Sequence, residues 1–225
     1  FIILLIAEGR TYYLAPAFPM LLAGGAVAIE GWLSSPRLAW LKVTYPAVLV
    51  IGGIATLPLF LPVLSPQVYV QFTRTLGLRQ PRIETFQESP LPQLFADRFG
   101  WPEMAQTVAK VYQTLTPAEQ EKAVILAGNY GQAGAIDFYG APLRLPNAIS
   151  GHQNYFFWGT RGYSGEVVIA IGMDPGVLRN YYGSVIYVLS THHPYAMPYE
   201  NTAVYVCKEP RMKLQEAWQN LKKWN

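Results

Sequence analysis

The stretch VTYPAVLVIGGIATLPLFLPVL, residues 43–64, decides the fold of the first part of the chain. It contains no charged residue, and the uncharged run around it extends from Lys42 to Arg74, about thirty residues. A helix needs roughly twenty apolar residues to cross the hydrocarbon core of a bilayer. We therefore predict a transmembrane helix from about Val43 to Leu64.

A second uncharged run lies upstream, between Arg10 and Glu30. It predicts another membrane span from about Tyr12 to Leu33, because prolines and glycine pairs are tolerated in membrane helices. The alternative is a buried helix of a soluble protein, and two such runs in succession argue against it. The apolar start of the sequence, residues 1–7, is interpreted as the end of a further transmembrane helix, so we expect more helices upstream.

The loop between the two spans, residues 34–42, carries Arg37 and Lys42 and no acidic residue. Basic loops stay on the cytoplasmic side of a membrane. We therefore expect residues 8–11 and everything after Ser65 to lie outside the cytoplasm. Trp32, Trp40 and Tyr45 stand at the apolar boundaries near this loop, where interfacial aromatic residues are typical.

Most of the 17 basic and 14 acidic residues lie after position 73, where the composition is typical of a globular domain. The net charge of +3 is spread without a basic run, which excludes a typical nucleic-acid interface. A single cysteine, Cys207, excludes an internal disulfide. We expect transmembrane helices over residues 1–65, a connector over 66–92 and an extracytoplasmic domain over 93–225.

Strands alternate with helices in this last part. Apolar spacing and capping residues predict helices over residues 101–115, after Thr116, and over 128–139, 177–182 and 211–224. Short apolar runs predict strands over residues 123–127, 166–172, 184–189 and 203–207. The alternation predicts a small α/β domain of three layers with a mostly parallel sheet.

The glycine string GNYGQAG, residues 128–134, follows a predicted strand and opens a helix, where a phosphate cradle would lie. Its spacing differs from the dinucleotide fingerprint, and no acidic residue follows between 138 and 165 to hold a ribose. A nicotinamide cofactor is therefore not expected. The alternative is a tight strand-to-helix turn that needs glycine for packing.

The stretch SGHQNYFFWG, residues 150–159, combines His152 and Asn154 with four aromatic residues. Such a loop can bind a sugar or a polar headgroup, since aromatic faces stack and His and Asn donate directional hydrogen bonds. The alternative is a loop that packs the domain onto its membrane part or onto the bilayer. His192 and His193 are adjacent, so in a strand they would point apart, and no metal site is predicted.

The stretch EGRTYYLAPAFP, residues 8–19, stands at the mouth of the first span. Arg10 can pair with a lipid phosphate, and the hydroxyls of Tyr12 and Tyr13 can donate to phosphate oxygens. An ordinary interfacial aromatic belt would also explain the two tyrosines.

From Arg10 to Pro19, and on through LLAGGA at residues 21–26, the sequence resembles a segment of the family 39 glycosyltransferases, polytopic membrane enzymes that use lipid-linked sugars. Several strings in the later part look like the C-terminal domain of bacterial members of that family: LPQ at 91–93, FADRFGW at 95–101, AGNYG at 127–131, SGH at 150–152 and WG at 158–159.

The resemblance implies an inverting glycosyltransferase of the bacterial cytoplasmic membrane. It would move a sugar from a polyprenyl-phosphate donor to an extracytoplasmic glycan, lipid or protein, without another cofactor. The family's acidic general base lies upstream of the matching segment, so the catalytic residue is not expected in this chain. Arg10, Tyr12 and Tyr13 would bind the donor phosphate, and His152 and Asn154 would contact the acceptor. The rival interpretation is a membrane-anchored binding domain without catalytic activity, which recognises a glycan or a partner protein.

Overall fold

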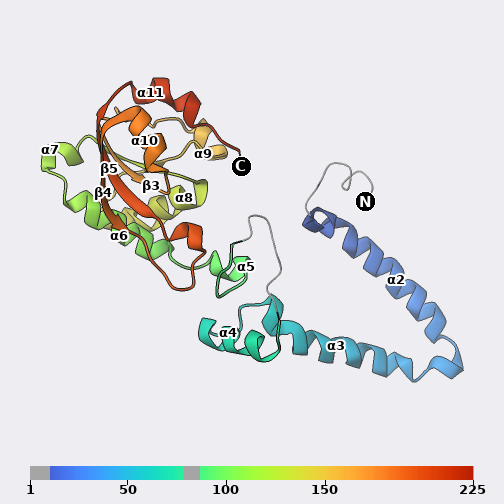
Figure 1. The fold of residues 1–225 in the computed structure, drawn as a ribbon. Helices are drawn as coiled ribbons and strands as arrows, with labels where there is room; N and C mark the ends of the chain where they lie inside the picture. The colour runs from blue at the N-terminus through green and yellow to red at the C-terminus, as the bar shows by residue number, and fades with distance from the viewer. Residues whose placement is uncertain (1–10, 79–86, 225) are drawn as a thin grey trace. The chain divides into compact units, whose positions relative to one another are not determined.

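The computed structural model describes residues 11–78 and 87–224, without the side chains of residues 11 and 12. The chain divides into two compact units, Phe1–Leu64 and Ser65–Asn225, which are taken one at a time below (Figure 1).

The first unit consists of helices. A 3₁₀ helix, η1 (Thr11–Ala17), leads into α2 (Phe18–Leu33), and η2 (Pro36–Leu38) precedes α3 (Leu41–Phe60). Among the described residues, two helical stretches are long and apolar enough to span a membrane, Tyr13–Leu33 and Pro36–Phe60. None of the residues of α2 or α3 is buried within the chain, although both helices are strongly apolar. Such helices need lipid or further protein around them.

A proline ends α3. The predicted second span reaches residue 64, whereas α3 ends at Phe60. Leu61 takes an extended conformation because the residue before a proline, here Pro62, is disfavoured in the helical region.

The hydroxyls of Thr44 and Thr56 donate to backbone carbonyls one turn earlier, at 3.1 and 2.8 Å. Each hydroxyl therefore has a hydrogen-bond partner within its own helical segment.

The second unit is built around a mixed five-stranded sheet with the order β2-β1-β3-β5-β4. Figure 1 labels β3, β4 and β5 of this sheet. Its strands are β1 (Ala123–Ala127), β2 (Ala148–Ile149), β3 (Val167–Ile171), β4 (Tyr182–Ser190) and β5 (Ala203–Pro210). β1 pairs in parallel with β2 and β3. β5 is antiparallel to both of its neighbours, β3 and β4, and is the one strand of this sheet that runs in the opposite direction.

Helices pack against both faces of this sheet. The longer ones are α6 (Trp101–Gln113), α8 (Tyr130–Tyr139) and α10 (Pro175–Tyr181). A further helix of this unit, α4 (Pro66–Thr75), packs instead against Phe95, whose ring lies 5.1 Å from the Tyr69 ring. Short helical turns complete the unit: α5 (Gln93–Ala96), α7 (Pro117–Gln120), η3 (Ala141–Leu143), α9 (Asn154–Phe157), η4 (Pro198–Glu200), α11 (Leu214–Ala217) and η5 (Trp218–Leu221).

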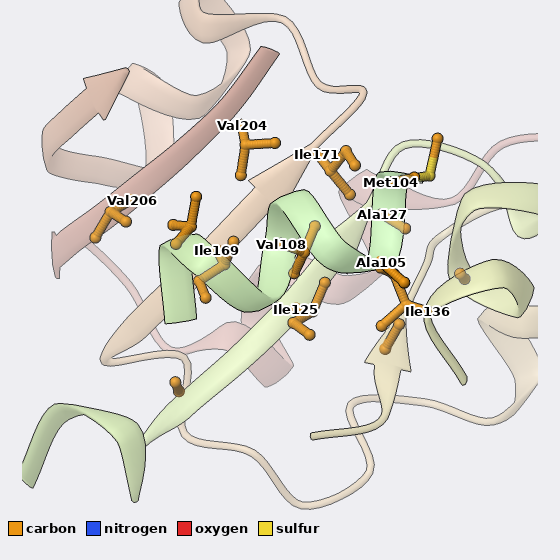
Figure 2. Close-up of a cluster of buried hydrophobic side chains, with 14 of the residues drawn as sticks. Met104, Ala105, Val108, Ile125, Ala127, Ile136, Ile169, Ile171, Val204 and Val206 are labelled. Atoms are coloured by element: carbon orange, nitrogen blue, oxygen red, sulfur yellow. The ribbon is translucent and has the colours of Figure 1, made fainter. Parts of the chain in front are cut away.

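Two hydrophobic clusters, one on each face, hold these layers together. Figure 2 shows Val108 of α6 close to Ile125 of β1 and Ile169 of β3, in the cluster that also contains residues of α8. The alternate residues of the strands enter the other cluster with Leu178 of α10 and Trp218 of η5. Because both faces of β1 and β3 are covered, every residue of these two strands is buried, which explains their unbroken apolar sequences.

The sequence prediction fails at the end of the chain. It places one amphipathic helix over residues 211–224, whereas the structure has only the short turns α11 and η5, followed by an extended tail. In that tail the N–H of Lys223 donates to Gly151 O at 2.9 Å, and Lys223 O accepts from Gln153 N at 3.0 Å. The tail thus gains hydrogen bonds that a continued helix would lose. The apolar side chains of this segment still face the core: Leu214 and Trp218 are buried, and Leu221 is half-buried.

Candidate functional site

A cleft opens at the carboxyl ends of the parallel strands β1 and β3. In the sheet, β2 pairs with one edge of β1 and β3 pairs with its other edge. The connections that leave β1 and β3 therefore go in opposite directions, which makes a topological switch point between these two strands. Ligands of α/β proteins bind preferentially at such a switch point. The cleft, called the switch-point cleft below, has a volume of about 260 Å³ and is lined by residues 126–128, 151, 172–174, 177 and 220–223.

Glycines let the backbone segments around the switch-point cleft approach closely. A Cβ on Gly128 would lie 2.0 Å from the carbonyl oxygen of Gly172. Gly172 itself has a φ of +65°, and a Cβ there would meet the side chain of Gln132. A Cβ on Gly151 would lie 1.9 Å from the carbonyl oxygen of Leu221. A side chain at any of the three would force neighbouring atoms to move, which agrees with the tight turn that the sequence offers as the alternative to a phosphate cradle.

Three N–H groups at and just before the first turn of α8 are engaged within the unit. Asn129 caps the helix, its Oδ1 accepting from Gln132 N at 2.8 Å. Tyr130 N donates to Nδ1 of His152 at 3.4 Å. The N–H of Gly128 is shared between Ile171 O at 2.8 Å and the Gln132 side chain at 3.1 Å. These are donors that a phosphate cradle at this helix would require.

A buried carboxylate fastens the turn between β1 and α8. Glu200, in η4, is 5% exposed, and its two oxygens accept from Asn129 Nδ2 at 3.2 Å and from Gln132 Nε2 at 2.9 Å. Burial raises the pKa of Glu200, and the two hydrogen bonds work in the opposite direction. The sequence offers no signal for this residue, because Glu200 stands 71 positions from Asn129.

His152 and Asn154, the predicted acceptor contacts, have different surroundings. His152 is half-buried, with its ring 5.0 Å from the ring of Tyr130. Burial, and next the positive charge of Lys223, lowers the pKa of His152. Asn154 is exposed at the first position of α9. His152 therefore belongs to the surroundings of the cleft, and Asn154 to the outer surface of α9.

The aromatic residues of the 150–159 loop divide between core and surface. Phe156 is buried and stacks on Trp218, with ring centroids 5.8 Å apart. Phe157 and Trp158 are 66% and 56% exposed. Phe157 contacts Trp224, which is 51% exposed, at a centroid distance of 5.8 Å. We call the three exposed rings Phe157, Trp158 and Trp224, together with Asn154, the α9 surface.

Asp137 holds the α9 segment against α8. Its Oδ1 accepts from Ala148 N at 2.7 Å, and its Oδ2 accepts from the Tyr155 hydroxyl at 3.2 Å and from the Arg161 guanidinium at 3.0 Å. Burial, and next the charge of Asp137, raises the pKa of Tyr155 to about 12, so its hydroxyl remains a donor. The guanidinium of Arg161 lies 5.1 Å from the Trp158 ring and fixes its place.

Of the predicted donor-site residues, Arg10 and the side chain of Tyr12 lie outside the described residues. Tyr13 is 55% exposed in η1. The ring of His193 stacks on Phe99 at 5.2 Å, and His192 is exposed. Within residues 11–78 and 87–224, no three His, Cys, Asp or Glu residues gather as a metal site would require.

No family model matches the chain, and neither a curated protein nor a solved structure matches it. The chemistry of the cleft and of the α9 surface therefore carries the functional conclusion.

Proposed function

We propose that the chain is part of an integral membrane glycosyltransferase of the bacterial cytoplasmic membrane, which takes a sugar from a polyprenyl-phosphate donor. In this proposal the apolar helices α2 and α3 cross the membrane. The three-layer α/β unit lies on the extracytoplasmic side and binds the acceptor. The motif at residues 10–19 supports the donor class, since a guanidinium and tyrosine hydroxyls suit a lipid phosphate.

The α9 surface is the observation that carries the acceptor role. Large aromatic rings gain free energy when they leave water, yet Phe157, Trp158 and Trp224 are all more than half exposed. Flat rings of this kind stack on the apolar faces of sugar rings. Asn154 is exposed on the same short helix and can donate and accept hydrogen bonds to sugar hydroxyls.

The second candidate function is binding without catalysis. For the α/β unit it is favoured because the carboxylates near the cleft and α9 are already engaged in hydrogen bonds. A general base must reach the acceptor hydroxyl. Asp137 accepts three hydrogen bonds, and Glu200 accepts two through its carboxylate. Asp174, at the cleft, caps α10 through Val177 N. In the glycosyltransferase proposal the base lies upstream of residue 10, as the family resemblance implies, and the unit binds the acceptor in both cases.

The acceptor role is tested with the full chain in lipid nanodiscs on an array of bacterial oligosaccharides. Phe157→Ala should weaken binding about five- to tenfold, because a ring stack contributes roughly 1 kcal/mol. Phe138→Ala is the matched control, since Phe138 is 74% exposed on α8 and outside the α9 surface. Equal binding by wild type and Phe157→Ala would remove the α9 surface from acceptor recognition.

The donor role is tested separately with a photoreactive polyprenyl-phosphate sugar. Arg10→Ala should reduce crosslinking to the full chain in nanodiscs while leaving its circular dichroism unchanged. Crosslinking at the wild-type level would refute a donor site at residues 10–13, whatever the array shows.

A further inference from the structure

Two lysines line the switch-point cleft without an acidic partner. In the described part of the chain the ion pairs are Lys122–Glu166, Arg161–Asp137 and Lys208–Glu119, and none involves Lys222 or Lys223. The Lys222 ammonium lies 5.0 Å from the Phe156 ring and 5.2 Å from the Trp224 ring. The Lys223 backbone is fixed by its hydrogen bonds to residues 151 and 153. Both lysines thus contribute to the lining of the cleft, and the backbone that carries them is fixed.

The other charged groups nearby do not neutralise this pair. Asp174 lines the cleft, but it supplies one negative charge and is engaged as the cap of α10. The pKa of His152 is lowered, so its ring is neutral at physiological pH and adds no charge of either sign. Partial burial lowers the pKa of Lys223, which is the effect of a charge that loses water without gaining a counterion.

The size and lining of the cleft limit the ligand. A volume of about 260 Å³ lies just below the range of roughly 300–1,000 Å³ found for small-molecule pockets. One small molecule fits, and a long oligosaccharide does not. Asn220 offers a polar amide, whereas Met173, Val177 and Leu221 offer apolar surface for a ring. A phosphomonoester carries between about one and a half and two negative charges at neutral pH, which matches two lysines better than a carboxylate does.

We propose that the switch-point cleft binds a small phosphomonoester of about the size of a monosaccharide phosphate, with Lys222 and Lys223 holding the phosphate. The ring of the ligand packs on Val177 and Leu221. The phosphate is carried either by a free sugar phosphate or by a lipid headgroup. This site adjoins the α9 surface, since the Lys222 ammonium lies 5.2 Å from the Trp224 ring, but the proposal does not depend on sugar transfer by the chain.

The test is isothermal titration calorimetry on the full chain in phosphatidylcholine nanodiscs, with glucose 1-phosphate, inorganic phosphate and glucose as probes. Glucose 1-phosphate should bind the wild type, and more tightly than glucose by at least tenfold. The double variant Lys222→Gln/Lys223→Gln should lose at least tenfold in affinity. Lys110→Gln, which removes one lysine charge from an exposed position of α6, should bind like the wild type.

A second variant keeps both lysines and blocks the space. Val177→Trp places a large ring in the cleft from an exposed position of α10, and it should weaken glucose 1-phosphate at least tenfold. Nanodiscs containing phosphatidic acid distinguish the sources: competition with glucose 1-phosphate indicates that a headgroup enters the cleft, and its absence indicates a free ligand. The proposal is overturned if glucose binds as tightly as glucose 1-phosphate, or if both cleft variants bind like the wild type.

Discussion

Two alanine substitutions in the glycine string 128–134 should change stability in opposite directions. Gly128 directly follows β1, and a Cβ there would lie 2.0 Å from the oxygen and 2.6 Å from the carbon of the Gly172 carbonyl. Both are backbone atoms, so the end of β3 must move by roughly 1 Å to make room. Overpacking of this kind costs about 1–3 kcal/mol, and a backbone neighbour places Gly128→Ala at the upper end.

Gly134 has the opposite surroundings. It lies inside α8, and a Cβ there would meet only the Tyr155 hydroxyl at 3.6 Å, an ordinary contact. Replacing a helical glycine by alanine removes backbone freedom from the unfolded chain and stabilises by about 0.5–1 kcal/mol. Glycine-to-alanine substitution should therefore destabilise the fold at Gly128 and stabilise it at Gly134, six positions away.

Thermal unfolding of the full chain in mild detergent, followed by near-ultraviolet circular dichroism, measures the difference. For a unit of this size 1 kcal/mol shifts the midpoint by about 2–4 °C. Gly128→Ala should lower it by about 4–10 °C, and Gly134→Ala should raise it by about 1–4 °C. Equal midpoints for the two variants would refute the steric argument. A Gly128→Ala protein of normal stability that had lost a ligand would restore the phosphate-loop interpretation.

Two further perturbations probe the residues beside the cleft. Glu200→Ala leaves Asn129 Nδ2 and Gln132 Nε2 without their acceptor. The free energy of unfolding, measured by urea titration, should therefore fall by about 2–5 kcal/mol. A loss below about 0.5 kcal/mol would show that water replaces the carboxylate. His152 has a pKa lowered below 6.5, so on acidification the unfolded chain takes up a proton before the folded chain does, and stability falls as the pH drops below about 6.5. In a plot of the thermal unfolding midpoint against pH, His152→Gln should flatten the part below about pH 6.5, and the control His192→Gln should not. Identical curves for wild type and His152→Gln would contradict a half-buried His152 beside Lys223.

Local patterns were sufficient for the elements of the second unit that depend on neighbours in the sequence. Residues 123–127 form a strand because they are uniformly apolar, and Thr116 and Asp174 cap helices through their own side chains. The two-residue strand β2 escaped prediction, since so short a strand exists only through its pairing with β1. The helix predicted over 211–224 failed because residues 222–224 lie in an extended tail whose Lys223 backbone pairs with the segment around His152.

The apolar stretches of residues 12–33 and 43–64 were determined by the sequence alone, because length and hydropathy are properties of a segment that require no partner. The glycines of residues 128–134 likewise predict a tight turn from the sequence alone. Only the tertiary structure decided what surrounds that turn. It brings Glu200 to Asn129 and places Lys222 and Lys223 at the switch point, because a sheet joins strands that lie far apart in the chain. A cavity and the charged residues around it come from segments that are far apart in the sequence. The local sequence pattern therefore does not predict them.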